Sequence, residues 1–161
     1  MIAMISYKLS RGGRGIVPVY IKPFGGLVLE RVYFKVDTGA DVTTIDKTFL
    51  YPLGYTQAWL ESNARQDKTR TLSPACGIKE SAWYVSIRLM NFAGRDLKNW
   101  PIYIRMEEHR NYPNLLGLDI LSNFNFTFDF DGAAARFEVA RNPALALPRL
   151  AAQEIMDFAG E

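Results

Sequence analysis

The residues with the clearest chemical potential are Asp37, Thr38 and Gly39, which follow an apolar strand pattern ending at Val36. The glycine lets the backbone turn tightly beside the carboxylate. Two carboxylates about 3 Å apart cannot both ionise cheaply, so they share one proton and can act as base and acid. The chain contains one copy of Asp-Thr-Gly, so this motif supplies one carboxylate of such a pair.

Three segments together resemble the retropepsin-like aspartic proteases, the family of the retroviral proteases and their cellular relatives. The segment Phe34–Asp41 resembles the catalytic loop of that family. The segment Asn114–Leu121, which contains Leu-Leu-Gly, resembles the motif that passes under this loop and enters a short helix. The segment Thr71–Gly77 lies where the family has its flap. The resemblance covers roughly residues 5–139.

The resemblance implies an aspartic endopeptidase that needs no metal and no cofactor. Because the chain has one Asp-Thr-Gly, the second carboxylate should be Asp37 of another copy in a homodimer. Thr38 and Gly39 complete the catalytic loop, and the threonine hydroxyl is expected to bond across the dimer axis. The substrate-binding residues that the resemblance implies are Ala40, Asp41, Ser73, Pro74, Ala75, Cys76 and Gly77.

The sequence departs from the family pattern at two places. Retroviral members usually follow the second glycine with an arginine that braces the acid after the catalytic loop. Leu118 stands there in this chain, so Asp41 needs another partner or none. Pro74 and Cys76 replace part of the glycine freedom of family flaps, which predicts a stiffer flap tip.

Other functions also fit the sequence. Asp37-Thr38-Gly39 can be an ordinary exit from a strand, and the flap segment can be a plain hairpin loop. A non-catalytic module of the same fold could bind an extended peptide as an added strand, or could mediate assembly through its C-terminal helix. Cleavage of peptides and the mass of the oligomer would separate these alternatives.

Composition excludes several other classes of chemistry. His109 is the only histidine and Cys76 the only cysteine, so a zinc site lacks ligands and an intrachain disulfide is impossible. A net charge of +2 favours neither nucleic acid nor an anionic membrane as a partner. No run reaches the ~18 apolar residues of a membrane span, and a single cysteine suits a reducing compartment. We therefore expect a cytoplasmic protein.

Alternation of apolar and polar residues predicts an all-β fold, and the resemblance implies a retropepsin-like closed β-barrel over residues 1–141. Two short helices are expected, capped by Asp46 and by Asp119, the latter after the Leu-Leu-Gly motif. Residues 61–70 look like a polar connection. An apolar stripe at helical spacing predicts an added C-terminal helix over residues 142–161. The predicted strands centre on residues 16–22, 32–36, 83–89, 102–106, 124–130 and 136–140.

Overall fold

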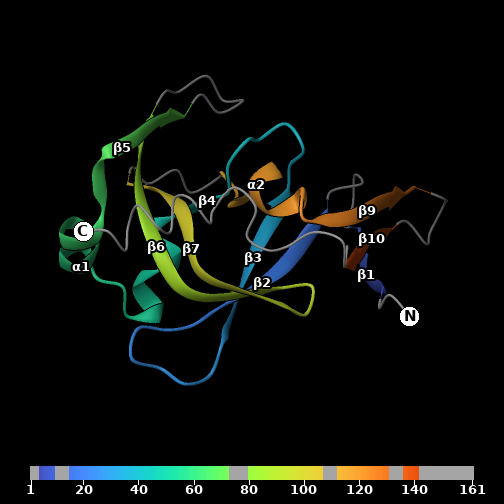
Figure 1. The fold of residues 1–161 in the computed structure, drawn as a ribbon, viewed down its shortest axis with the longest axis horizontal. Coiled ribbons are helices and arrows are strands. Elements are labelled where there is room, and N and C mark those ends of the chain that lie inside the picture. Colours follow the sequence, from blue (N-terminus) through green and yellow to red (C-terminus); the bar gives the residue numbers. More distant parts are fainter. Residues whose placement is uncertain (1–3, 10–14, 73–79, 107–111, 131–135, 142–161) are drawn as a thin grey trace.

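The computed structural model describes residues 4–9, 15–72, 80–106, 112–130 and 136–141. Most of these residues lie in strands, and the helices are short (Figure 1). The elements in chain order are β1 (Met4–Lys8), β2 (Ile16–Ile21), β3 (Glu30–Val36), β4 (Thr44–Asp46), η1 (Lys47–Phe49), η2 (Tyr51–Leu53), α1 (Gln57–Asn63), β5 (Arg65–Leu72), β6 (Glu80–Phe92), β7 (Arg95–Arg105), β8 (Leu115–Leu116), α2 (Leu118–Leu121), β9 (Phe124–Asp129) and β10 (Arg136–Arg141), where η denotes a 3₁₀ helix.

The larger sheet closes on itself. Its strand order is β2-β3-β8-β4-β7-β6-β5, and β2 also pairs with β6 through Tyr20 opposite Asn91 and Ile21 opposite Met90. The ring of strands confirms the predicted all-β closed architecture. Strand β5 lies outside the ring and, among the described strands, pairs with β6 alone.

Alternating side chains fill the inside of this ring. On β3, Val32, Phe34 and Val36 are buried, whereas Arg31 and Tyr33 face solvent. The same period of two on the other long strands brings further apolar side chains into one core. Its largest fully buried side chains include Trp100, Tyr84, Phe34, Phe92, Ile21, Ile45, Leu50, Leu60, Ile87 and Met90.

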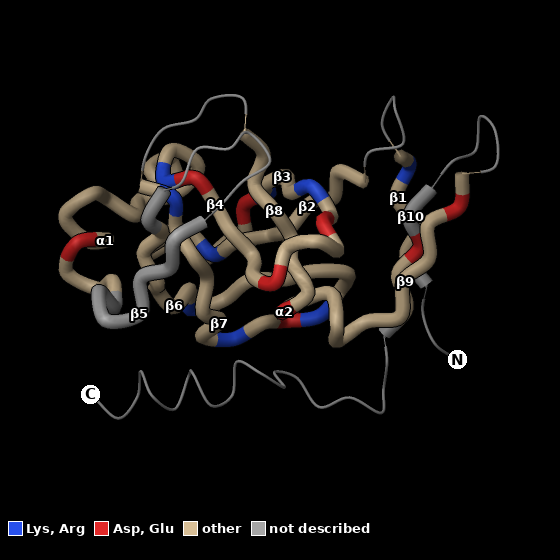
Figure 2. Tube along the Cα trace, turned by 90° about the horizontal axis from the view of Figure 1, so that it is seen from above, with Lys and Arg blue, Asp and Glu red and all other residues tan. Residues whose placement is uncertain are grey.

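A second, smaller sheet has the order β1-β10-β9, with antiparallel pairing throughout. Figures 1 and 2 show it beside the ring, at the side away from α1. Phe128 on β9 lies close to Gly15, where an added Cβ would meet its ring at 3.2 Å. Gly15 also accepts a hydrogen bond from Val36 N (2.7 Å), so the small sheet adjoins the strand that carries Asp37.

Two helix predictions have different outcomes. Asp46 caps η1 as expected, because its carboxylate accepts a hydrogen bond from Thr48 N at 2.9 Å. Asp119 does not cap α2. The cap is Gly117, and Asp119 lies in the first turn, where its carboxylate accepts from Ile120 N. A carboxylate is favourable at either position because the first turn exposes unpaired amides.

The predicted polar connection over residues 61–70 was wrong. Helix α1 occupies its start, capped by Thr56 and held by the buried Leu60, and β5 occupies its end. A strand with few apolar residues forms here because β6 supplies a hydrogen-bonding partner. The predicted C-terminal helix over residues 142–161 lies outside the described residues. No helix in the described ranges is long and apolar enough to cross a membrane.

Candidate active site

The loop that carries Asp37 begins where β3 ends. Strand β8 lies between β3 and β4, parallel to β3 with Val36 opposite Leu116, and antiparallel to β4 with Thr44 opposite Leu115. Residues 37–43 therefore connect β3 to β4, the two strands that pair with β8. In Figure 1 this loop is the cyan turn above β3, at the same end of the barrel as the free ends of β5 and β6.

The Asp37 carboxylate is half-buried and held by its own loop. Oδ1 accepts a hydrogen bond from Gly39 N at 2.9 Å, and Asp37 N donates to Leu116 O at 3.0 Å. A Cβ at Gly39 would lie 3.2 Å from Oδ1. Gly39 is not among the glycines with positive φ, so the backbone conformation at this position does not require a glycine. The glycine keeps the space beside the carboxylate free.

The loop passes closely over Gly117. A Cβ at Gly117 would meet the carbonyl carbon and oxygen of Val42, each at 2.6 Å, and Ala40 O at 2.9 Å. Backbone hydrogen bonds join the same segments, from Leu118 N to Ala40 O (2.8 Å) and from Asp119 N to Asp41 O (3.2 Å). The first turn of α2 therefore satisfies its amides with loop carbonyls. The Leu-Leu-Gly motif supports the loop as the resemblance implied.

Thr43 is a site residue that the sequence analysis missed. Its buried hydroxyl donates to Asp119 Oδ1 at 2.6 Å and accepts from Gly117 N at 3.0 Å. Both partners lie more than 70 positions away along the chain, so no local pattern indicates the contact. One hydroxyl thus joins the end of the loop to the glycine under it.

Asn114 is the second residue whose role the sequence did not reveal. Its side chain is buried, accepts from Asp46 N at 2.8 Å and donates to Tyr33 O at 3.3 Å. Its own carbonyl accepts from Lys35 N at 2.7 Å. Asn114 therefore holds β3 and β4 at a fixed separation, on both sides of the loop that they carry.

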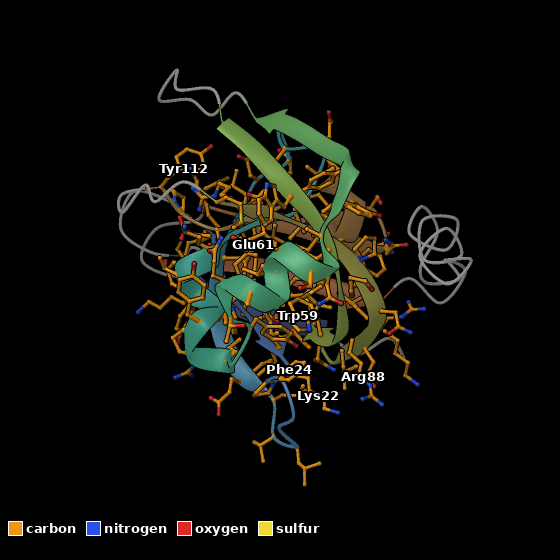
Figure 3. The ribbon with its side chains drawn as sticks, turned by 90° about the vertical axis from the view of Figure 1, so that its left-hand side faces the viewer. Lys22, Phe24, Trp59, Glu61, Arg88 and Tyr112 are labelled. Atoms are coloured by element: carbon orange, nitrogen blue, oxygen red, sulfur yellow. The ribbon has the colours of Figure 1, made fainter. Side chains whose placement is uncertain are left out.

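A buried arginine side chain holds the two residues that precede Asn114 in the chain. Arg105 at the end of β7 is 0% exposed, and its Nη2 donates to the carbonyls of Tyr112 and Pro113, each at 3.2 Å. The guanidinium carbon lies 4.7 Å from the centre of the Tyr112 ring. Figure 3 labels Tyr112 at the upper end of the barrel. These contacts fix Tyr112 and Pro113, because a planar guanidinium can donate several hydrogen bonds and stack on an aromatic ring at the same time.

The remaining predicted loop residues have distinct positions. Thr38 is exposed, and its hydroxyl makes no hydrogen bond to the residues that the structure describes. Ala40 is half-buried, with its N–H donating to Asp37 O at 3.2 Å. Asp41 is exposed, and its carboxylate likewise has no partner within the described ranges. Since Leu118 replaces the expected arginine, the brace to Asp41 is the backbone bond from Asp119.

The predicted flap residues Ser73, Pro74, Ala75, Cys76 and Gly77 lie outside the described residues, as does His109. The strands on either side of the flap segment are described. Strands β5 and β6 pair antiparallel, with Leu72 opposite Glu80 and an irregular register between Arg65 and Arg70. In the described part of the chain, no group of three or more His, Cys, Asp or Glu side chains could hold a metal ion.

Neither the protein-family models nor the curated protein sequences give a significant match. Among solved structures, the chain is similar to a retropepsin-like aspartic protease from Rickettsia conorii. The TM-score is 0.63 at 20% identity, with 88% of this chain and 92% of the other covered.

Two further structures are similar at lower scores. The EIAV protease in complex with the inhibitor HBY-793 has a TM-score of 0.49 and 17% identity, covering 72% of this chain and 92% of that one. The retroviral protease-like domain of Ddi1 from Leishmania major has a TM-score of 0.47 and 18% identity, covering 82% and 96%. On the match to the Rickettsia protein, the closed ring of strands has a retropepsin-like fold.

Proposed function

We propose that the protein is an aspartic endopeptidase whose active form is a homodimer, with water activated between two Asp37 carboxylates. The observation that carries the proposal is the half-buried Asp37 carboxylate, which lies on a loop that α2 holds in place. Gly39 N orients its Oδ1, and the backbone of α2 holds the following carbonyls. Such preorganisation is what acid–base catalysis by a pair of carboxylates requires.

The need for a second copy follows from the chemistry of one carboxylate. A single Asp cannot be both the base that activates water and the acid that protonates the carbonyl oxygen in the same step. The chain carries one Asp-Thr-Gly, so a two-fold axis next to the loop would bring two Asp37 side chains together. The exposed Thr38, whose hydroxyl has no described partner, is available for a contact across that axis.

The reaction proceeds in two stages, the formation and the breakdown of a gem-diol. The unprotonated Asp37 removes a proton from a bound water as the water oxygen attacks the peptide carbonyl carbon. The protonated Asp37 of the other copy donates its proton to the carbonyl oxygen, giving a neutral gem-diol. In the breakdown of this intermediate, the first Asp37 gives its proton to the leaving nitrogen and the second takes a proton from a diol hydroxyl. The C–N bond breaks, and the pair again holds one proton.

Substrate contacts in the proposal come from the loop and from the flap segment. Asp41 and Ala40 would meet the substrate backbone beside Asp37, and residues 73–77 would close over it. The hairpin of β5 and β6 supports this assignment, because its free end lies at the same end of the barrel as the Asp37 loop (Figure 1).

Cleavage of a mixed peptide library from mildly acidic to neutral pH tests the proposal. Asp37→Asn keeps the shape of the side chain but can neither take nor give the proton, so cleavage should fall by at least about a thousandfold. Asp96→Asn is the matched control, since Asp96 is an exposed carboxylate that accepts a hydrogen bond from Asn91 Nδ2, which an amide oxygen can also accept. Equal cleavage by Asp37→Asn and wild type would overturn the mechanism.

A test of the dimer completes the experiment. Light scattering gives the mass of the particle, and wild type mixed with excess Asp37→Asn should lose activity as mixed dimers form. Activity that stays proportional to the wild-type chain alone would contradict a shared pair. Because one carboxylate acts as base and the other as acid, cleavage should follow a bell-shaped pH profile.

A peptide-binding module is the second candidate. Strand β5 is the last strand of the larger sheet and pairs with β6 alone among the described strands, so its outer edge can receive an extended peptide. Binding of library peptides without cleavage, by wild type and by Asp37→Asn alike, would favour this function.

A further inference from the structure

A second exposed feature lies at the opposite end of β3 from Asp37. Residues 22–29 connect β2 to β3, and we call them the β2–β3 tip. Figure 1 shows the tip as the blue loop below the barrel, whereas the Asp37 loop lies above it. Leu27 is 94% exposed, Val28 74% and Phe24 58%. Single exposed apolar side chains are ordinary, but three within five positions form a patch typical of a contact surface.

The base of the tip is firmly anchored, so the exposure is built into the fold. Phe24 N donates to Leu53 O at 2.8 Å, and the Tyr55 hydroxyl donates to Lys22 O at 2.6 Å. The Phe24 ring meets the rings of Tyr55 and Trp59 edge-on, with centroids 6.0 and 6.1 Å away. These contacts hold one side of the turn against the barrel, while Leu27 and Val28 remain in solvent.

Of the four charged residues in the tip or beside it on β3 and β6, three are cations: Lys22, Arg31 and Arg88. Residues 23–29 carry no charge, and Lys22 precedes them. Arg88 belongs to the neighbouring β6, where Lys22 N donates to Leu89 O at 2.9 Å. Figure 3 shows Lys22 and Arg88 at the same lower end as Phe24. Arg31 follows on β3, and the one acid of the four, the exposed Glu30, lies directly after the tip.

We propose that the β2–β3 tip inserts into the interfacial region of a membrane that contains anionic lipids. An uncharged apolar tip beside cations complements a surface that is apolar inside and negative outside. A protein partner would need a concave site shaped to receive the tip, whereas a bilayer receives a convex apolar tip without such a match. Net charge over the whole chain does not reveal this grouping, which is why it indicated no membrane partner.

Membrane contact through the tip also sets the orientation of the barrel. Because the tip and Asp37 lie at opposite ends of β3, membrane contact leaves the Asp37 loop directed away from the lipid. The proposal does not depend on proteolysis, and the experiment below measures no cleavage.

Flotation with vesicles tests the proposal on the full chain. Wild type should float with phosphatidylcholine vesicles containing about 30% phosphatidylglycerol and much less with phosphatidylcholine alone. Leu27→Ser combined with Val28→Ser should lower the partition coefficient about tenfold or more, and Lys22→Gln with Arg88→Gln by a smaller factor. Phe130→Ser is the control. Phe130 is likewise an exposed apolar residue, at 64%, but it lies after β9 and not in the tip, so this variant should float as wild type does.

A second readout reports insertion directly. Leu27→Trp should show fluorescence that brominated lipids quench, beyond the quenching of wild type, whose tryptophans include the half-buried Trp59. Circular dichroism melts would verify that each variant folds. Failure of wild type to float would overturn the proposal, and so would equal flotation of all variants. A particle mass that falls in the Leu27→Ser, Val28→Ser variant, without flotation of wild type, would identify the tip as a contact between copies instead.

Discussion

At its C-terminal end, β3 runs into a loop held by hydrogen bonds from buried polar groups, whereas at its N-terminal end it follows a turn anchored by aromatic rings. Asn114 and Thr43 supply the polar contacts at the Asp37 end. Phe24, Tyr55 and Trp59 pack at the other end, with the Tyr55 and Trp59 centroids 4.9 Å apart. Hydrogen bonds fix direction as well as distance, so they suit a loop that must orient a carboxylate. Ring packing, with the hydrogen bonds from Phe24 N and the Tyr55 hydroxyl, holds the base of the exposed tip.

The largest expected effect is from Asn114→Ala, which removes the side chain that bridges β3 and β4. Asp46 N and Tyr33 O would each lose a buried partner, at about 1–3 kcal/mol each, so the free energy of unfolding should fall by about 3 kcal/mol. Urea unfolding measures this change. Asn114→Leu keeps most of the volume but makes neither hydrogen bond, so a loss much smaller than that of Ala would contradict the two-contact account.

Gly117→Ala should disturb the Asp37 end through volume alone. Its Cβ would lie 2.6 Å from the Val42 backbone, which must move, and overpacking of this kind costs about 1–3 kcal/mol. Peptide cleavage should fall along with stability because the displaced segment is continuous with Asp37. The comparison variant is Gly25→Ala at the tip, where an added Cβ meets nothing within 4 Å but φ is +71°. That variant should lose stability without losing cleavage.

Thr43→Val keeps the shape of the side chain and removes the hydroxyl. Gly117 N would then be a buried donor without its partner, at a cost of about 1–2 kcal/mol in unfolding free energy. Thr43→Ser retains the hydroxyl and should recover most of the stability. If Ser and Val variants melt alike, the hydroxyl does not contribute as the geometry indicates.

The smallest expected effect concerns the aromatic end. Tyr55→Phe keeps the ring contacts and removes the 2.6 Å hydrogen bond to Lys22 O, so stability at neutral pH should fall by about 1 kcal/mol. Burial also raises the pKa of Tyr55 above its usual 10.0. The unfolded chain therefore loses this phenolic proton first as the pH rises, and wild-type stability should decline above pH 10. Thermal melts from pH 7 to 11 should show a weaker decline in the Phe variant.

Tyr7 is the internal reference for that measurement. Burial, and then the neighbouring Tyr20, raise the pKa of Tyr7 above 10.0 as well. Tyr7 remains in the Phe variant, so part of the alkaline decline should persist. Complete loss of the decline in Tyr55→Phe would show that Tyr7 contributes nothing to it.

The sequence correctly predicted features that depend on near neighbours. The alternation of Val32, Phe34 and Val36 determines which face of β3 is buried, whatever the strand pairs with. Asp46 caps η1 because its carboxylate needs only the amide two residues on. Prediction was weakest over residues 61–70, where β5 has little apolar pattern and depends on pairing with β6.

The amino-acid order alone identifies the reactive group and its number: one Asp37, in one Asp-Thr-Gly, at the end of an apolar strand. The contacts that hold this group, and the exposed tip at the other end of the same strand, follow from the folded arrangement of the strands. Thr43 meets Gly117 and Asn114 meets Tyr33 across separations of 74 and 81 positions. Contacts of that range exist only once the strands have taken their places, because no local preference can specify which distant partner a buried hydroxyl or amide will find.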